Sequence, residues 1–247
     1  MTMTNTNPSN SPDQKTQAGH FQLTKALPGM IFTILLPFVC LILISGQWGW
    51  WQGWALLSIT SLATIGGRYL LIKKQPDLAN ERVNYKEKSG TQSWDMKLMP
   101  IVAIFGPLAI WITAGLDKRF SASVPLPAVI EITALLLVAA AYAFSTWAML
   151  ENRFFAAVVR IQTDRHHLVI ESGPYRLVRH PGYAGSFIAS LLIPLALGTF
   201  WVYIPALLTN LVVCIRTAKE DQFLQAELSG YTAYTQKTRY RLIPGIW

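Results

Sequence analysis

Long apolar runs are the feature that most constrains what this chain can fold into. Four of them, near residues 27–45, 50–71, 98–116 and 126–150, are close to the ~20 residues that a helix needs to cross a hydrocarbon core. Hydrophobic residues make up 52% of the chain and charged residues only 14%, which argues against a soluble domain. The pattern therefore predicts an all-α, polytopic helical membrane protein.

A fifth apolar stretch, from Tyr183 to Ile215, is too long for one untilted span and short for two. Gly198 near its middle predicts a tight helical hairpin, which brings the expected total to about six spans. Residues 1–24 are rich in Asn, Thr, Ser and Pro and predict a disordered tail. We therefore divide the chain into this tail, four spans within residues 25–150, and a region 151–247 with polar turns, the hairpin and a final polar helix.

The basic residues predict how these spans are oriented. If both termini are cytoplasmic, all but two of the 21 Lys and Arg residues, Lys118 and Arg119, lie on the cytoplasmic side. The net charge of +8 thus reflects membrane loops, and no basic helix interleaved with aromatic residues indicates a nucleic-acid partner. The compact size favours a bacterial inner membrane.

Four tryptophans cluster at the turn between the first two spans, where an interfacial aromatic belt is expected. They are Trp48, Trp50, Trp51 and Trp54. Cys40 and Cys214 lie in separate apolar runs and are interpreted as packed core residues. His166, His167 and His180 are the only histidines near one another along the chain, and no Cys/His set has zinc spacing, so no metal is expected.

Polar chemistry concentrates in the stretch GPYRLVRHPGY, Gly173 to Tyr183, directly before the hairpin. Its Gly-Pro and Pro-Gly pairs predict turns rather than one continuous helix. Such a stretch is either a surface loop with cytoplasmic arginines or irregular backbone that lines a cavity. His180, at the mouth of a span, is accordingly either a solvated side chain or a site residue.

A second polar cluster, IRTAKEDQFL, follows the hairpin. Arg216 and Glu220 are four residues apart and share one helix face. They form either a weak surface pair or a site in which Arg216 holds a carboxylate by two hydrogen bonds and Glu220 binds a cation. Glu131, one turn into the fourth span, is interpreted as an interfacial glutamate near a helix N-terminus.

The order of these motifs resembles the isoprenylcysteine carboxyl methyltransferase family, which is grouped with phospholipid N-methyltransferases. The resemblance covers about residues 150–245, and its specific core is GPY, then RHPxY, then Arg-x-x-x-Glu after the hairpin. It implies a helical membrane bundle whose cytoplasmic C-terminal part encloses S-adenosylmethionine. No glycine-rich dinucleotide-binding fingerprint is present, which agrees with a cofactor site outside the Rossmann class.

The resemblance also implies roles for particular residues. Arg216 falls where the family holds its acceptor substrate, and we expect Arg216, Glu220 and His180 to act in catalysis. Three departures are the short gap between Gln162 and His167, Gly182 where the eukaryotic enzymes often have Ser, and an acidic run reduced to Glu220 and Asp221. The expected cofactor contacts are Gln162, His167, Leu168, Val169, Ile170, Tyr175, His180, Pro181, Gly182, Tyr183 and Glu220.

Three functions are compatible with these features. The leading one is an S-adenosylmethionine-dependent methyltransferase that acts in the membrane on a lipid-like or prenylated acceptor, through a carboxylate, an amine or a thiol. The second is an NADPH-dependent membrane reductase, because sterol reductases share a similar C-terminal architecture. The third is a membrane scaffold or transport component that kept the fold and lost the activity.

Overall fold

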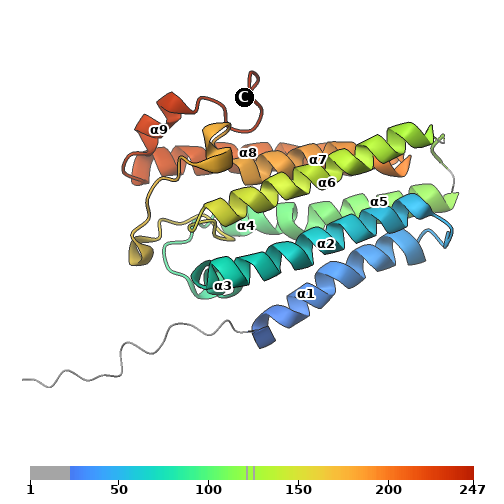
Figure 1. Ribbon diagram of the computed structural model, residues 1–247, viewed down its shortest axis with the longest axis horizontal. Helices are drawn as coiled ribbons and strands as arrows, with labels where there is room; N and C mark the ends of the chain where they lie inside the picture. The colour runs from blue at the N-terminus through green and yellow to red at the C-terminus, as the bar shows by residue number, and fades with distance from the viewer. Residues whose placement is uncertain (1–22, 121, 125) are drawn as a thin grey trace, which may run out of the picture.

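A computed structural model describes residues 23–120, 122–124 and 126–247. The described residues form helices, turns and loops but no strand, so the all-α prediction is confirmed. The tail expected at residues 1–24 lies outside the described residues, except for its last two positions, which begin α1 (Leu23–Phe38). The long helices run side by side as a bundle (Figure 1).

Four helical segments are long and apolar enough to cross a membrane, and two shorter apolar helices accompany them. Together these six segments correspond to the six predicted spans. The long segments are α2 (Trp51–Lys74), the rod Asp95–Phe120 formed by α4 (Asp95–Pro100), η4 (Ile101–Phe105) and α5 (Gly106–Phe120), α6 (Ala128–Glu151), and the rod Phe200–Glu227 formed by η7 (Phe200–Val202) and α8 (Tyr203–Glu227). The shorter ones are Ile31–Leu43, which ends in the π-helical turn η2 (Val39–Leu43), and α7 (Pro181–Leu197).

The predicted helical hairpin is confirmed at Gly198. This residue ends α7 with a φ of 62°, a left-handed conformation that glycine adopts without steric cost. The chain then enters η7 and α8, which packs back against α7.

Close contact between α6 and α7 depends on small residues. A Cβ atom at Gly185 of α7 would collide with the Ser145 hydroxyl and the Ala141 carbonyl of α6. Small residues at such crossings let two membrane helices approach closely enough for extensive van der Waals contact. The α6–α7 pair therefore forms a rigid wall that begins at His180, the residue just before α7.

Three of the four tryptophans predicted to form an interfacial belt have the exposure that such a belt requires. Trp48, Trp51 and Trp54 are exposed, whereas Trp50 is only 2% exposed and belongs to the main hydrophobic core. The reason is local: Trp50 immediately precedes α2, and its ring folds over Gly53, where a Cβ atom would lie 2.7 Å from the ring. Both cysteines are free; Cys40 is buried and Cys214 is half-buried.

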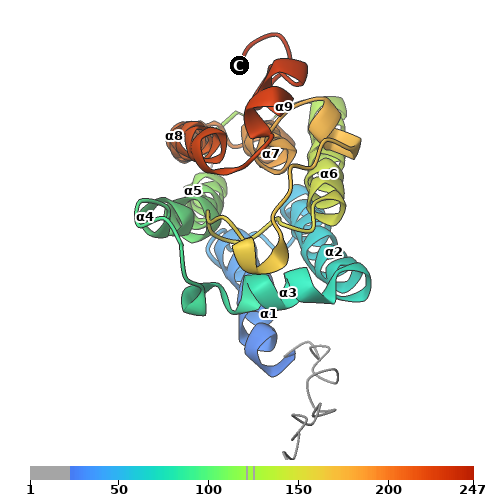
Figure 2. The same ribbon diagram turned by 90° about the vertical axis from the view of Figure 1, so that its left-hand side faces the viewer.

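The polar segments gather at one end of the bundle, which Figure 2 views end-on. They include α3 (Pro76–Val83), η3 (Tyr85–Glu87), the irregular segment 152–180 and α9 (Tyr231–Lys237). The polar helix expected after Ile215 is not separate, because α8 continues without a break to Glu227. The final residues also fold back: the backbone N–H groups of Arg179 and His180 donate to the carbonyls of Tyr240 and Arg241 at 2.9 and 3.0 Å.

Candidate active site

The stretch that joins α6 to α7 is a series of short turns. Its only helical pieces are η5 (Thr163–Arg165) and η6 (Gly173–Arg176), which confirms that GPYRLVRHPGY is not one helix. Gly173 has a φ of 55°, and a Cβ atom there would lie 2.9 Å from the Glu151 side chain. Pro181 occupies the first turn of α7, where its missing N–H leaves no helical hydrogen bond unmade. The turns thus carry His180 directly to the start of α7.

These turns, the start of α7, the polar half of α8 and α9 enclose a space of about 410 Å³, which we call the turn cavity. Most of the residues predicted for a site contribute to its lining, including both His180 and Glu220. Those residues are His167, Leu168, Val169, Ile170, Tyr175, His180, Gly182, Tyr183, Arg216 and Glu220. The two polar clusters of the sequence, on either side of the hairpin, therefore meet in one chamber.

Two of the predicted cofactor residues do not line the turn cavity. Gln162 is 1% exposed, and its Nε2 donates to the Phe154 carbonyl at 2.8 Å. Its backbone N–H donates to Nδ1 of His167 at 3.3 Å, so Gln162 orients a residue that does line the cavity. Pro181 is buried at the start of α7. Their direct contact with a cofactor remains a prediction that this geometry does not favour.

One face of the cavity is built from His180, Tyr183 and Glu220. The rings of His180 and Tyr183 stack with 5.9 Å between centroids and 11° between planes. The Tyr183 hydroxyl donates to Oε2 of Glu220 at 2.7 Å. Within the described part of the chain, Oε1 of Glu220 makes no hydrogen bond or ion pair, so one carboxylate oxygen stays available to a ligand.

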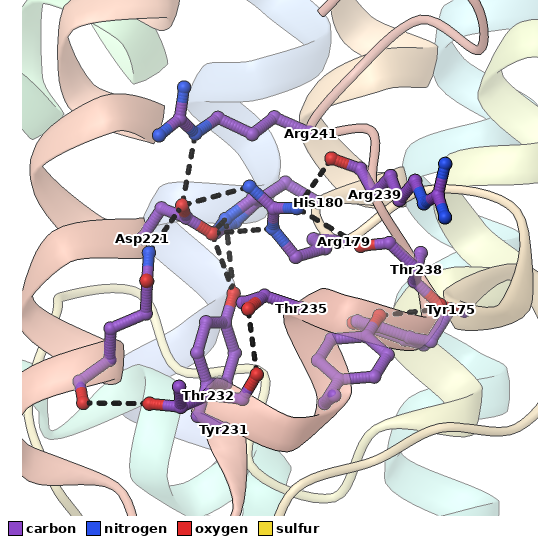
Figure 3. A network of polar contacts seen from close by, with 12 residues as sticks. Tyr175, Arg179, His180, Asp221, Tyr231, Thr232, Thr235, Thr238, Arg239 and Arg241 are labelled. Atoms are coloured by element: carbon purple, nitrogen blue, oxygen red, sulfur yellow. Dashed lines mark hydrogen bonds and ion pairs between the residues drawn. The ribbon is translucent and has the colours of Figure 1, made fainter.

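Behind this face lies Asp221, whose side chain is fully buried (Figure 3). Nε and Nη2 of Arg179 donate to its two oxygens at 2.7 and 3.0 Å, and Nε of Arg241 donates to Oδ2 at 2.9 Å. Nε2 of His180 lies 3.3 Å from Oδ1. Burial, and then the charge of Asp221, raises the pKa of Tyr231, so this phenol stays protonated and donates to Oδ1 at 3.0 Å. The network holds His180 in place and ties the C-terminal segment to α8.

Arg216 is buried rather than part of a surface pair with Glu220. Its Nε and Nη2 donate to the two oxygens of Asp95 at 2.6 and 3.1 Å, and Nη2 also donates to the Ala157 carbonyl at 3.2 Å. The guanidinium carbon lies 5.1 Å from the centre of the Tyr183 ring. Since Asp95 occupies two of the three nitrogens, only Nη1 is left among the described contacts to meet a ligand. The expected two-hydrogen-bond clamp on an acceptor is therefore not available.

His167 also lines the cavity and is uncharged at neutral pH. Burial lowers its pKa to about 4, and the positive charges of Arg160 and Arg165 act in the same direction. Its ring packs on Phe154 with 4.4 Å between centroids. His167 thus contributes a neutral aromatic ring to the lining rather than a further cation.

The departure at Gly182 has a structural explanation. A Cβ atom at this position would lie 2.5 Å from the ring of Phe155, which also lines the turn cavity. Glycine and the phenylalanine ring fit together here, and a serine would require the ring to move. The sequence alone did not indicate this, because nothing in the motif points to Phe155 as its neighbour.

Several residues of the site were not predicted. Asp95 and Arg179 stand out only in retrospect: Asp95 is a carboxylate at the start of an apolar run, and Arg179 lies within the RHP motif. Asp221 was noted only as part of a shortened acidic run, and Tyr231 only within the similar C-terminal stretch. Within the residues that the structure describes, no three His, Cys, Asp or Glu side chains are arranged to hold a metal ion.

Glu131 lies away from this site, at the Gly198 end of the bundle. It is 5% exposed, and Nε2 of Gln52 donates to its Oε2 at 2.8 Å. A Cβ atom at Gly198 would lie 3.0 Å from Oε1 of Glu131. These contacts account for the residue through its packing at the hairpin turn.

The fold and the cavity define an integral membrane protein with a chamber at the polar end of its helical bundle. Residues 133–226 match the profile of the Isoprenylcysteine carboxyl methyltransferase (ICMT) family. The match runs from α6 through the turns and α7 into α8, and it supports the family assignment that the motifs predicted and, with it, a membrane methyltransferase. It lends no support to the reductase alternative. No curated protein matches the chain.

Proposed function

We propose that the turn cavity binds S-adenosylmethionine and that the protein transfers a methyl group from it to a lipid-like acceptor in the membrane. The observation that carries this proposal is that His180, Tyr183 and Glu220 line one chamber together with residues 167–170 of the turns. The chamber, about 410 Å³ in volume, falls within the range of roughly 300–1,000 Å³ typical of small-molecule sites.

The residues present fit the chemistry of this cofactor. Its cationic groups are attracted to a carboxylate and to the faces of aromatic rings, which Glu220 and Tyr231 supply. The apolar side chains of Leu224 and Leu228 provide a wall suited to a purine ring. When bound, S-adenosylmethionine supplies a methyl group that its sulfonium makes electrophilic.

The contribution of the chain itself is alignment and exclusion of water. Tyr183 is held between the Glu220 carboxylate and the Arg216 guanidinium, and His180 is held by Asp221 and Tyr231. Groups fixed in this way position reactants without a further loss of conformational freedom. A displacement at an sp³ methyl group by an anion needs little acid–base help, so orientation in a water-poor chamber is the main requirement.

The chemistry of the acceptor follows from the same argument. A carboxylate, such as that of a prenylated cysteine, is already an anion and needs no proton acceptor, whereas a neutral thiol or a protonated amine would need one. Nη1 of Arg216 can donate a single hydrogen bond to such a carboxylate. We therefore favour a carboxylate acceptor over an amine or a thiol.

Cofactor binding tests the proposal directly. Calorimetry on the full chain in a neutral detergent should show binding of S-adenosylhomocysteine and none of NADPH. The opposite result would replace the methyltransferase by the reductase. Transfer of a labelled methyl group to a panel of lipid carboxylates, amines and thiols then identifies the acceptor, and binding without any transfer would indicate a scaffold.

A further inference from the structure

A second cavity adjoins the turn cavity. Its volume is about 640 Å³, and it is formed mainly by α1, α2, α3 and α6, so we call it the α2 cavity. Arg82, Phe155, Gly182 and Ser186 line both cavities, which places the boundary between them at the Phe155 ring and the first turns of α7. Figure 2 shows α2, α3 and α6 close to one another at this end of the bundle.

Two arginines line the α2 cavity without a carboxylate partner. Arg68 of α2 makes no hydrogen bond or ion pair with any described residue. Arg82 of α3 uses Nη1 to donate to the carbonyls of Phe155 and Ala156, at 2.9 and 3.4 Å, and its guanidinium carbon lies 5.5 Å from the centre of the Phe155 ring. Neither cation is neutralised by the described part of the protein.

By contrast, three buried arginines elsewhere in the described chain have carboxylate partners. Arg160 pairs with Glu81 and Asp164, Arg179 with Asp221, and Arg216 with Asp95. An unpaired charge in a partly dehydrated cavity is costly, and the cost falls when an anion enters. Burial and then the charge of Arg68 lower the pKa of Arg82 to about 10, in keeping with two guanidinium groups that line the same cavity.

The remaining wall of the α2 cavity suits an aliphatic chain. From Arg68 it extends along α2 to Thr60, roughly 12 Å at 1.5 Å per residue. Ala63, Trp111 and Tyr142 contribute apolar surface along this stretch, and Leu71, Ile72 and Met149 contribute it at the Arg68 end. The hydroxyl of Thr60 donates to carbonyls of its own helix, so it does not demand a polar partner from the cavity.

We propose that the α2 cavity holds the acceptor, with Arg68 and Arg82 binding an anionic group on it, a carboxylate or a phosphate, while its aliphatic chain lies along α2. This inference rests on the proposed methyltransferase function and assigns most of the recognition of the acceptor's anion to Arg68 and Arg82, because Asp95 balances the charge of Arg216 and leaves only its Nη1 to donate to an acceptor. The anion then lies next to Phe155 and Gly182, at the boundary with the turn cavity.

Direct binding of simple amphiphiles to the full chain in a neutral maltoside detergent tests this site. The probes are radiolabelled hexadecanoate, hexadecyl phosphate and hexadecan-1-ol, which share a chain length and differ in head group. We expect at least one of the two anions to bind on the order of tenfold or more tightly than the alcohol. A preference for hexadecanoate identifies the anion as the acceptor's carboxylate, and a preference for hexadecyl phosphate identifies a phosphorylated head group.

The variant Arg68→Gln gives the most specific test of the anion site, because it removes a charge without breaking a described hydrogen bond. It should lower affinity for the preferred anion by about tenfold and leave the alcohol unchanged, whereas Arg68→Lys should retain most of the preference. Lys73→Gln, an exposed charge on the same helix, is the matched control and should change neither. Equal affinity for anions and alcohol, or equal effects of Arg68→Gln and Lys73→Gln, would overturn the inference.

Binding of S-adenosylhomocysteine, measured on the same samples, separates this inference from the proposed function. If it binds but the anions show no preference over the alcohol, the anion site fails and the methyltransferase proposal stands. If the anions bind in an Arg68-dependent way and S-adenosylhomocysteine does not bind, the methyltransferase proposal fails, and with it the assignment of the anion as an acceptor.

Discussion

At the scale of single residues, the two carboxylate oxygens of Glu220 have different surroundings. One oxygen accepts a hydrogen bond from Tyr183, and the other has no partner among the described residues. A charge-assisted contact from that oxygen to a bound cation contributes about 1.5–3 kcal/mol.

Replacing this carboxylate by an amide should therefore weaken cofactor binding. We expect Glu220→Gln to lower the affinity for S-adenosylhomocysteine by about tenfold or more in calorimetry. Glu227→Gln, an exposed glutamate on the same helix, is the matched control and should leave it unchanged. If the two variants bind equally well, Glu220 does not contact the cofactor.

His167 predicts a dependence of stability on pH. Its pKa is about 4 in the folded chain and about 6.5 in the unfolded one, so between these values the unfolded state binds more protons. This contribution to stability is fully present above pH 6.5 and is lost as the pH falls toward 4.

The thermal unfolding midpoint in detergent should accordingly decrease as the pH is lowered from 6.5 to 4. The substitution His167→Asn should make this decrease smaller. His166→Asn provides the control, because His166 is exposed and its φ of 52° is a conformation that asparagine tolerates. If His166→Asn reduces the pH dependence of the unfolding midpoint as much as His167→Asn does, His167 is not its cause.

The limits of prediction at this scale are shown by Arg216. Its position at the end of an apolar run and four residues before Glu220 was enough to single it out. Its partner Asp95 is 121 residues away, and no periodicity or spacing relates the two. The pairing exists because the start of α4 lies against α8 in the folded bundle. As a result, Nε and Nη2 of Arg216 are bonded to Asp95, and only Nη1 can bind a further anion.

At the scale of elements, the α6–α7 pair determines where the site begins. Gly185 faces Ser145 and Ala141 with no room for a side chain, whereas Gly66 of α2 has no atom within 4 Å of the position its Cβ atom would take. Both are glycines within helices, so helix propensity alone would favour alanine at either position.

The two positions should respond in opposite directions to the same substitution. Gly185→Ala should destabilise the protein by about 1–3 kcal/mol through overpacking. Gly66→Ala should leave it unchanged or stabilise it by up to about 1 kcal/mol. Unfolding midpoints of the two variants in detergent compare them, and a tolerated Gly185→Ala would contradict the close α6–α7 packing.

Some helix boundaries were predicted from the sequence and one was not. Gly198 and Pro181 punctuate the chain as expected, because their backbone preferences are local. The continuation of α8 through Arg216 was not expected, since polarity was used to end the span. Polarity marks where a helix leaves the apolar layer, whereas a helix ends where backbone hydrogen bonding stops, here at Leu228 before Gly230.

At the scale of the whole molecule, the distribution of basic residues predicts that the site end of the bundle faces the cytoplasm. Labelling with a membrane-impermeant thiol reagent measures this in a background with Cys40→Ala and Cys214→Ala. In intact cells, Ala122→Cys should be labelled and Ser93→Cys should be protected until the membrane is permeabilised. Both positions are exposed, so burial does not explain a difference. The reverse pattern would invert the predicted orientation.

By itself, the sequence determined the helical membrane class, the hairpin at Gly198 and the motifs on either side of it, because hydropathy and backbone preferences act over a few residues. Only the tertiary structure decided which charges are already paired and which face a cavity unpaired. That difference depends on segments far apart in the chain, α4 against α8 and α2 beside α3, since a buried ion pair forms wherever packing brings its members together. For this reason, Asp95 neutralises Arg216, whereas no described carboxylate reaches Arg68 or Arg82.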